Sequence, residues 1–69
     1  MFLSMADFGE ERVIAGVRGG DELKHRLEAM GFVSGERVTV LSVLGGNLIV
    51  DVKGTRVAIS RAIADKIIV

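Results

Sequence analysis

The chain has 69 residues, nine basic and nine acidic side chains, and no cysteine. A chain of this length supports one small core, and the absence of cysteine excludes a disulfide framework and a thiolate metal site. Its balanced charge excludes general attraction to nucleic acid, and no apolar run approaches the roughly 20 residues that cross a bilayer. We therefore expect one soluble domain over residues 1–69, without nucleic-acid binding or membrane insertion.

The first eleven residues are unusually apolar and precede a predicted strand. The apolar members are Met1, Phe2, Leu3, Met5 and Phe8. We expect this segment to pack against the domain or a partner, and the apolar end at residues 67–69 invites the same expectation. A homo-oligomer is therefore as expected as a monomer. The β-branched residues within Arg12–Val17 then predict the first strand, which the Gly19–Gly20 pair ends.

A short amphipathic helix follows these glycines. Leu23, Leu27 and Met30 recur at positions i, i+4 and i+7, so they share one face of a helix. An apolar face of this kind is normally covered. We expect it, together with Phe32, to close one end of the fold.

Both ends of this helix carry recognisable signals. Asp21 is predicted to be the N-cap, because a short carboxylate can accept hydrogen bonds from the free N–H groups of the first turn. At the other end Gly31 suits the left-handed conformation, which would place Phe32 against Leu27 in a Schellman motif. The helix is therefore expected over Glu22–Met30.

The second half of the chain is predicted to be a meander of strands. Alternating apolar residues indicate strands over 37–44, 47–52 and 55–59, with tight turns at Gly45–Gly46 and Lys53–Gly54. A helical turn over 61–64 then leads into a last strand over 66–69. About five short strands in so few residues predict a mainly β protein, folded as a small barrel that hides its strand edges.

The helix also carries a resemblance to a known family. The pattern R-L-x-x-M-G-F-x-x-G-x-x-V of the FeoA family is matched by Arg26, Leu27, Met30, Gly31, Phe32, Gly35 and Val38. The closing segment of the family is similar to Gly54, Val57, Ala58, Ile59, Ala64, Ile67 and Val69, and its opening strand to Leu3, Phe8, Gly9 and Ile14. The chain departs from the family at Asn47–Leu48, where many members have proline, and at Ser60, where many have arginine.

The resemblance implies a fold, a pathway and a partner. The fold would be an SH3-like barrel with one helix between its first two strands. The function would be that of a cytoplasmic accessory of bacterial ferrous iron transport, which contacts the FeoB membrane permease and its GTPase domain. The helix and the following loop would form the docking surface, with candidate residues Leu23, Arg26, Leu27, Met30, Gly31 and Phe32. Arg26 borders the apolar face, although pairing with Glu22 at i, i+4 also explains it.

A divalent metal site on the helix is an alternative hypothesis. Asp21, His25 and Glu28 lie on the side away from the apolar face, and imidazole and carboxylate groups bind transition metals. Side chains diverge on a convex helix, however, so a solvated surface is the competing interpretation. No cofactor is otherwise expected, and such a site would hold Fe²⁺ or a similar ion weakly.

The sequence also bears on two other classes of function, an enzyme and a domain of a transcriptional repressor. An enzyme is not expected, because His25 is the only histidine and the hydroxyl groups stand singly. Metal-dependent transcriptional repressors carry a similar barrel as a regulatory domain, so a detached domain of that kind is an alternative. No helix-turn-helix precedes the barrel in this sequence, which favours the transport accessory.

Overall fold

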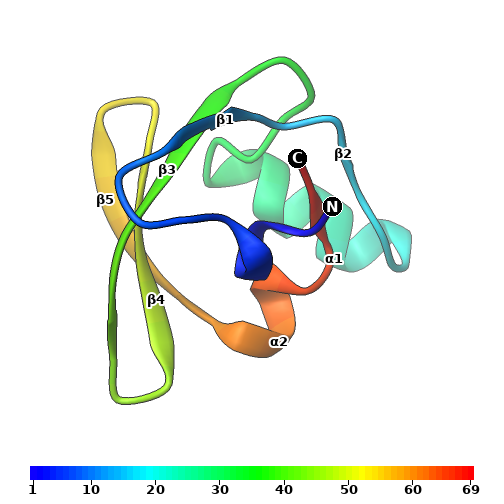
Figure 1. Cartoon of the computed structure of the whole chain (residues 1–69). Coiled ribbons are helices and arrows are strands. Elements are labelled where there is room, and N and C mark those ends of the chain that lie inside the picture. The colour runs from blue at the N-terminus through cyan, green and yellow to red at the C-terminus, as the bar shows by residue number, and fades with distance from the viewer.

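The computed structural model describes all residues 1–69, and six short strands make up most of its regular structure. The elements in chain order are η1 (Leu3–Met5), β1 (Glu11–Val13), β2 (Gly16–Val17), α1 (Asp21–Ala29), β3 (Arg37–Leu44), β4 (Asn47–Val52), β5 (Thr55–Ser60), α2 (Arg61–Ala64) and β6 (Ile67–Ile68). The predicted mainly β class is confirmed, but there are six strands in place of about five, and α1 lies between the second and third strands, β2 and β3 (Figure 1).

The strands form two separate antiparallel sheets, so the strand edges are not all hidden as the sequence predicted. One has the order β1-β3-β4-β5, and the other pairs β2 with β6. The prediction of one continuous strand over 12–17 is wrong, because the Ile14 N–H donates to the Glu36 carbonyl while the Ala15 N–H donates to the Ile68 carbonyl. Successive residues therefore bond to different parts of the fold, and the chain crosses from one sheet to the other at this point.

Two tight turns build the meander from β3 to β5. Gly45–Gly46 has φ values of +58° and +82°, and Lys53–Gly54 has +54° and +75°. Positive φ at both central residues defines the type I′ turn, which matches the twist of hairpin strands. The predicted alternation is confirmed as well, since Leu48, Val50 and Val52 are buried along β4.

Helix α1 begins and ends one residue earlier than the predicted Glu22–Met30, while the motif that ends it is the predicted one. Its N-cap is Gly20, which makes no side-chain cap, so the predicted cap at Asp21 is wrong. Asp21 instead lies in the first turn, where its charge complements the helix dipole. At the other end the Phe32 N–H donates to Leu27 O (2.9 Å) and the Gly31 N–H to Glu28 O (3.0 Å). These two bonds, with Gly31 at φ +102°, form the predicted Schellman motif.

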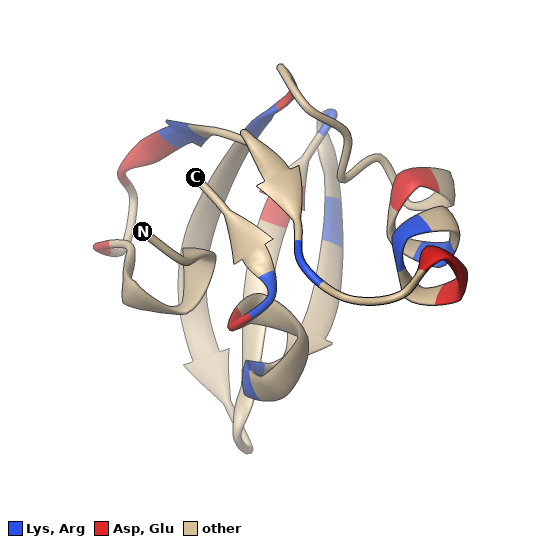
Figure 2. Ribbon diagram, turned by 90° about the vertical axis from the view of Figure 1, so that its right-hand side faces the viewer, with Lys and Arg blue, Asp and Glu red and all other residues tan.

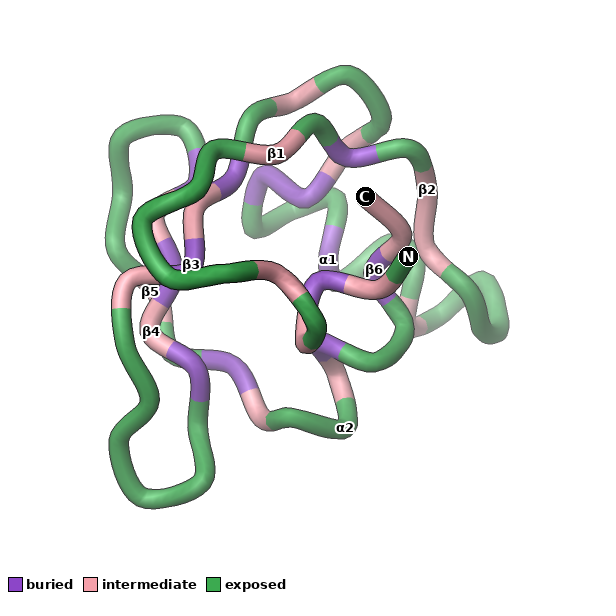
Figure 3. Tube along the Cα trace, in the orientation of Figure 1, coloured by how far each residue is buried: buried purple, intermediate pink, exposed green.

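One apolar core joins the sheets, the helices and the N-terminal segment (Figure 3). Its twelve members are Leu3, Ile14, Leu27, Phe32, Val38, Val40, Leu48, Val50, Val52, Ile59, Ala64 and Ile67. The N-terminal segment packs on the domain through Leu3, and the Val69 N–H donates to Met1 O, so the two termini lie side by side (Figure 1). None of the helices has the length and apolar character needed to span a bilayer.

Candidate functional site: an apolar groove beside helix α1

A groove of about 190 Å³ separates α1 from the end of the four-stranded sheet. Figure 2 shows α1 standing to the side of this sheet. One wall consists of Leu23, Arg26, Leu27 and Met30 from α1. The other wall consists of Ala58, Ile59 and Ser60 from β5 and Ile63 from α2. Six of the eight lining residues are hydrophobic, so the groove can take an apolar group.

The predicted apolar face of α1 divides into a covered part and an open part. Leu27 and Phe32 are 3% and 0% exposed and belong to the core, as predicted for residues that close one end of the fold. Leu23 is only half-buried, and Met30 is 42% exposed. The open part of this face therefore lies in the groove.

The structure brings together four of the six predicted docking residues. Leu23, Arg26, Leu27 and Met30 all line the groove, whereas Gly31 and Phe32 are buried outside it. Gly31 holds the turn that buries Phe32, so these two residues act on the groove only through the position of α1. The wall opposite α1 was not predicted. Its one sequence signal is Ile63, an apolar residue in a short helix.

Arg26 is the only charged residue that lines the groove. It forms no ion pair, because the two ion pairs of the structure join Arg12 to Glu10 and Arg37 to Glu11. The predicted pairing of Arg26 with Glu22 is therefore absent. An exposed guanidinium beside an apolar surface can bind the carboxylate of a ligand with two hydrogen bonds.

The three candidate metal ligands occupy the exposed surface of α1. Asp21, His25 and Glu28 are all exposed. The structure contains no group of three or more His, Asp or Glu side chains close enough to hold a metal ion. Glu28 shares a second hollow with Lys24, whose cation would compete for its carboxylate. Metal binding at these residues stays a prediction, which titration of the protein with a divalent metal ion can test.

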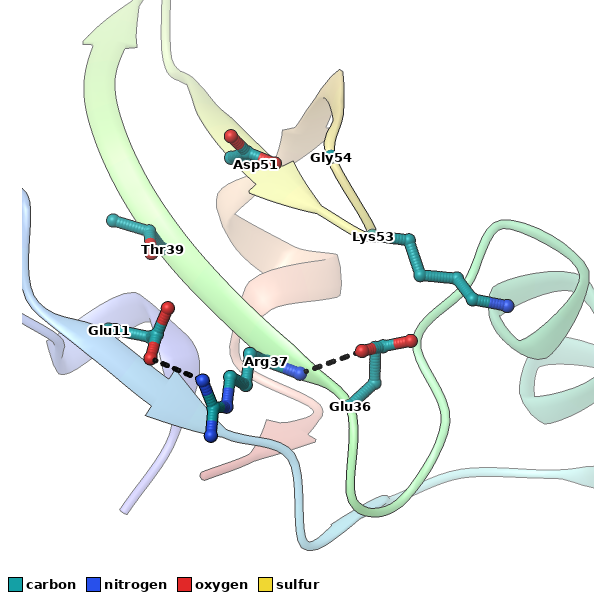
Figure 4. Close-up of a pocket in the computed structure, with 7 residues that line it drawn as sticks. All are labelled: Glu11, Glu36, Arg37, Thr39, Asp51, Lys53 and Gly54. Atoms are coloured by element: carbon teal, nitrogen blue, oxygen red, sulfur yellow. Dashed lines mark hydrogen bonds and ion pairs between the residues drawn. The ribbon is translucent and has the colours of Figure 1, made fainter.

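A larger hollow of about 340 Å³ lies on the sheet and is polar (Figure 4). Its lining residues are Glu11, Glu36, Arg37, Thr39, Asp51, Lys53 and Gly54. Arg37 Nη1 lies 3.6 Å from Glu11 Oε1, and the Arg37 N–H donates to Glu36 Oε2 at 3.1 Å. The Arg37 and Glu11 side chains are 73% and 60% exposed, so water screens their attraction. Asp51 and Lys53 form no ion pair, so the hollow presents charges of both signs and favours no single class of ligand.

Three of the serine hydroxyl groups form hydrogen bonds within the fold. Ser4 donates to Asp65, Ser34 donates to the Ala15 carbonyl, and Ser60 accepts from the Ile63 N–H as the N-cap of α2. None of them is hydrogen-bonded to His25. These bonds hold the loops and caps of the fold in place.

Comparison with known proteins identifies relatives over the whole chain. The model of a family described as the FeoA domain matches residues 1–69. A protein of Methanocaldococcus jannaschii named "Putative Fe(2+) transport protein A" is 34% identical over 67 residues, which cover 97% of this chain and 82% of that protein. The crystal structure of a Stenotrophomonas maltophilia protein, described as FeoA complexed with zinc and as an SH3 domain protein, is 31% identical. It has a TM-score of 0.84 and covers 99% of this chain and 87% of the other.

A second kind of protein has the same fold. IdeR from T. acidophilum superposes with a TM-score of 0.83 over 97% of this chain and 32% of its own, at 22% identity. A likeness at this identity concerns the fold alone. Together these structures confirm the predicted SH3-like fold.

Proposed function

The chain belongs to the FeoA family, and on that premise we propose that it is a cytoplasmic accessory of ferrous iron transport that binds a FeoB-like permease. The relative from M. jannaschii supports the pathway through its name. The apolar groove supports action by contact, since four predicted docking residues meet there beside an unpaired guanidinium. That arrangement is the observation that carries the proposal.

The size and lining of the groove favour a protein partner over a small ligand. Sites for small molecules usually enclose about 300–1,000 Å³ and bury most of the ligand, whereas this groove measures about 190 Å³. Methionine and arginine are enriched at protein interfaces, and both line the groove at Met30 and Arg26. One or two side chains of a partner would fill it.

The proposal is tested by measuring binding to the cytoplasmic GTPase domain of a FeoB-like permease. Arg26→Ala should weaken binding by at least about tenfold, since tenfold corresponds to about 1.4 kcal/mol and hot-spot residues, among which arginine is enriched, contribute about 2 kcal/mol or more. Arg37→Ala is the matched control, because this arginine is also exposed but lines the polar hollow. GTPase and iron-uptake assays with both variants would then show whether contact activates or inhibits the permease. Equal binding by the two variants would remove the groove from the interface.

Two alternatives from the sequence have support of different strength. The fold shared with IdeR is compatible with a regulatory domain of a metal-dependent repressor, but the likeness does not extend to function. A divalent-metal module using Asp21, His25 and Glu28 has a relative that was crystallised with zinc. Failure to bind the permease, together with metal-induced shifts at these residues, would favour the second alternative.

Self-association remains a separate prediction of the apolar termini. Met1, Met5 and Phe8 are 47%, 67% and 64% exposed, although Leu3 is buried. Sedimentation at two protein concentrations distinguishes a homo-oligomer from a monomer. Replacement of Phe8 by serine should shift a self-association equilibrium toward the monomer if this segment forms the contact.

A further inference from the structure

Strand β5 is an uncovered edge of the four-stranded sheet. It has six residues, pairs with β4 on one side, and has no strand on its other side. The opposite edge, β1, has only three residues. An open edge presents unpaired N–H and C=O groups, which can bond to another chain.

The register identifies which groups of β5 point outward. Lys53–Gly54 is a two-residue turn, so the flanking residues Val52 and Thr55 exchange both of their backbone hydrogen bonds. Bonded and non-bonded pairs alternate from there along an antiparallel ladder. Arg56 and Ala58 consequently direct their N–H and C=O groups away from β4. Neither residue has a backbone hydrogen bond to the turns or loops of the chain.

The open edge and the apolar groove lie at the same place. Ala58 lines the groove and is exposed, and Arg56 is exposed beside it on β5. A peptide that adds a strand to a sheet edge gains affinity from backbone hydrogen bonds and specificity from side chains that enter adjacent pockets. This part of the molecule offers both features.

Three arginines lie at or near this edge. Arg26 lies in the groove, Arg56 is one of the two outward-facing residues of β5, and Arg61 follows β5 at the start of α2. None of the three forms an ion pair, although Asp51 lies opposite Arg56 in the ladder. Figure 2 shows basic positions on α1, β5 and α2 and also acidic positions on α1, but no acidic residue lines the groove. An acidic segment complements these charges, whereas two copies of β5 placed edge to edge would bring their arginines together.

We propose that β5 binds an extended, acidic segment of a partner protein as an added strand, with one apolar side chain of that segment in the groove. Acidic side chains of the segment then face Arg26, Arg56 and Arg61. This inference rests on the proposed function for the identity of the partner, but the mode of binding can be tested without it.

The first test uses a capped six-residue peptide of alternating leucine and glutamate at about 1 mM, a concentration that detects weak binding. Amide hydrogen exchange by NMR is the measurement. Arg56 and Ala58 should exchange about fivefold more slowly at four-fifths occupancy, because only the free fraction exchanges. Thr55 and Val57 should change little, since their amides already bond to β4. A peptide with lysine in place of glutamate should bind more weakly.

Three outcomes would overturn the proposal. The first is absence of slowing at Arg56 and Ala58, and the second is equal binding of the acidic and basic peptides. The third is the same slowing when the chain alone is concentrated, which would indicate that β5 pairs with a second copy. Each outcome is read from the unmodified protein.

A pair of variants tests the backbone contact directly. Ala58→Pro removes an outward N–H without removing a bond to β4, and proline is tolerated on edge strands. It should weaken peptide binding by about tenfold, because one hydrogen bond is lost and its partner is left unsatisfied. Ala58→Val keeps the N–H but adds bulk to the groove wall, so the backbone contact is indicated by weaker peptide binding of Ala58→Pro than of Ala58→Val. If Ala58→Pro does not fold, the exchange measurement on the unmodified chain still decides the question.

The permease domain separates this inference from the proposed function. If that domain binds and the amides of Arg56 and Ala58 exchange as in the free protein, strand addition is excluded and the proposed function stands. If the acidic peptide slows exchange of these amides but the permease domain does not bind, the proposed function fails. The inference that β5 binds an extended acidic segment then still stands.

Discussion

The apolar stripe of Leu23, Leu27 and Met30 along α1 and its C-cap has a side that the fold covers and a side that it leaves open. The covered side consists of Leu27 and Phe32, which belong to the core. The open side consists of Leu23 and Met30, which line the groove beside Arg26, whereas Leu27 contacts both the core and the groove. Residues three or four positions apart thus divide between the core and an open groove, where we propose that a partner binds. The comparison teaches that helical periodicity identifies an apolar face, whereas the neighbouring elements determine how much of it is covered.

Replacement of Phe32 tests the covered side and has the largest expected effect. Phe32→Ala should destabilise the fold by about 3–5 kcal/mol, because it removes a fully buried ring. Small domains have about 5 kcal/mol of total stability, so much of the variant should be unfolded at 25 °C. Chemical denaturation measures this loss. Phe8→Ala is the control, since Phe8 is 64% exposed and its removal should cost less than about 0.5 kcal/mol.

Replacement of Gly31 tests the turn that buries Phe32. Gly31→Ala should cost about 1–2 kcal/mol, because a side chain disfavours positive φ. The new Cβ would also lie 3.4 Å from Lys53 Cδ and 3.7 Å from Val52 Cγ2, so crowding adds little. Gly16→Ala is the control, as it has open space and lacks a positive φ. Equal melting temperatures for the two variants would contradict the role of the turn.

Replacement of Met30 tests the open side. Met30→Gln should change the free energy of unfolding by less than about 1 kcal/mol, since the side chain is 42% exposed. It should nevertheless weaken binding to the permease domain, because it places a polar amide in an apolar groove. Leu44→Gln, at an exposed hairpin tip, serves as the control for a general loss of apolar surface. A large loss of stability in Met30→Gln would place Met30 on the covered side.

The features predicted from the sequence are those set by residues close together in the chain. The Gly45–Gly46 turn and the alternation on either side of it predicted the β3–β4 hairpin. Gly31 and Phe32 predicted the helix stop in the same way. The break at Ile14–Ala15 was missed, because it depends on carbonyl groups of Glu36 and Ile68 that only the folded chain brings near.

The groove, too, could be predicted from the sequence only where it depends on residues close together in the chain. Its α1 wall follows from helical spacing, and four of its residues were predicted. Its opposite wall requires β5 and α2 to stand beside α1, and no local pattern encodes that placement. The open edge at Ala58 likewise follows from strand order, which is a property of the whole sheet.

Replacement of His25 has the smallest expected effect and tests the solvent-exposed surface of α1, which is neither the covered side nor the open side. His25 is exposed on α1 and lines neither the core nor the groove. His25→Ala should therefore change the free energy of unfolding by less than about 0.5 kcal/mol and leave permease binding unchanged.

Titration with ferrous, manganous or zinc ion, followed by NMR, tests the metal hypothesis on the same residue. A genuine site requires shifts at Asp21, His25 and Glu28 together and their loss in His25→Ala, because side chains that diverge on a convex helix must be drawn together by the ion. Unmoved shifts at modest excess would assign this side of α1 to solvent alone, so that only the open side remains for recognition.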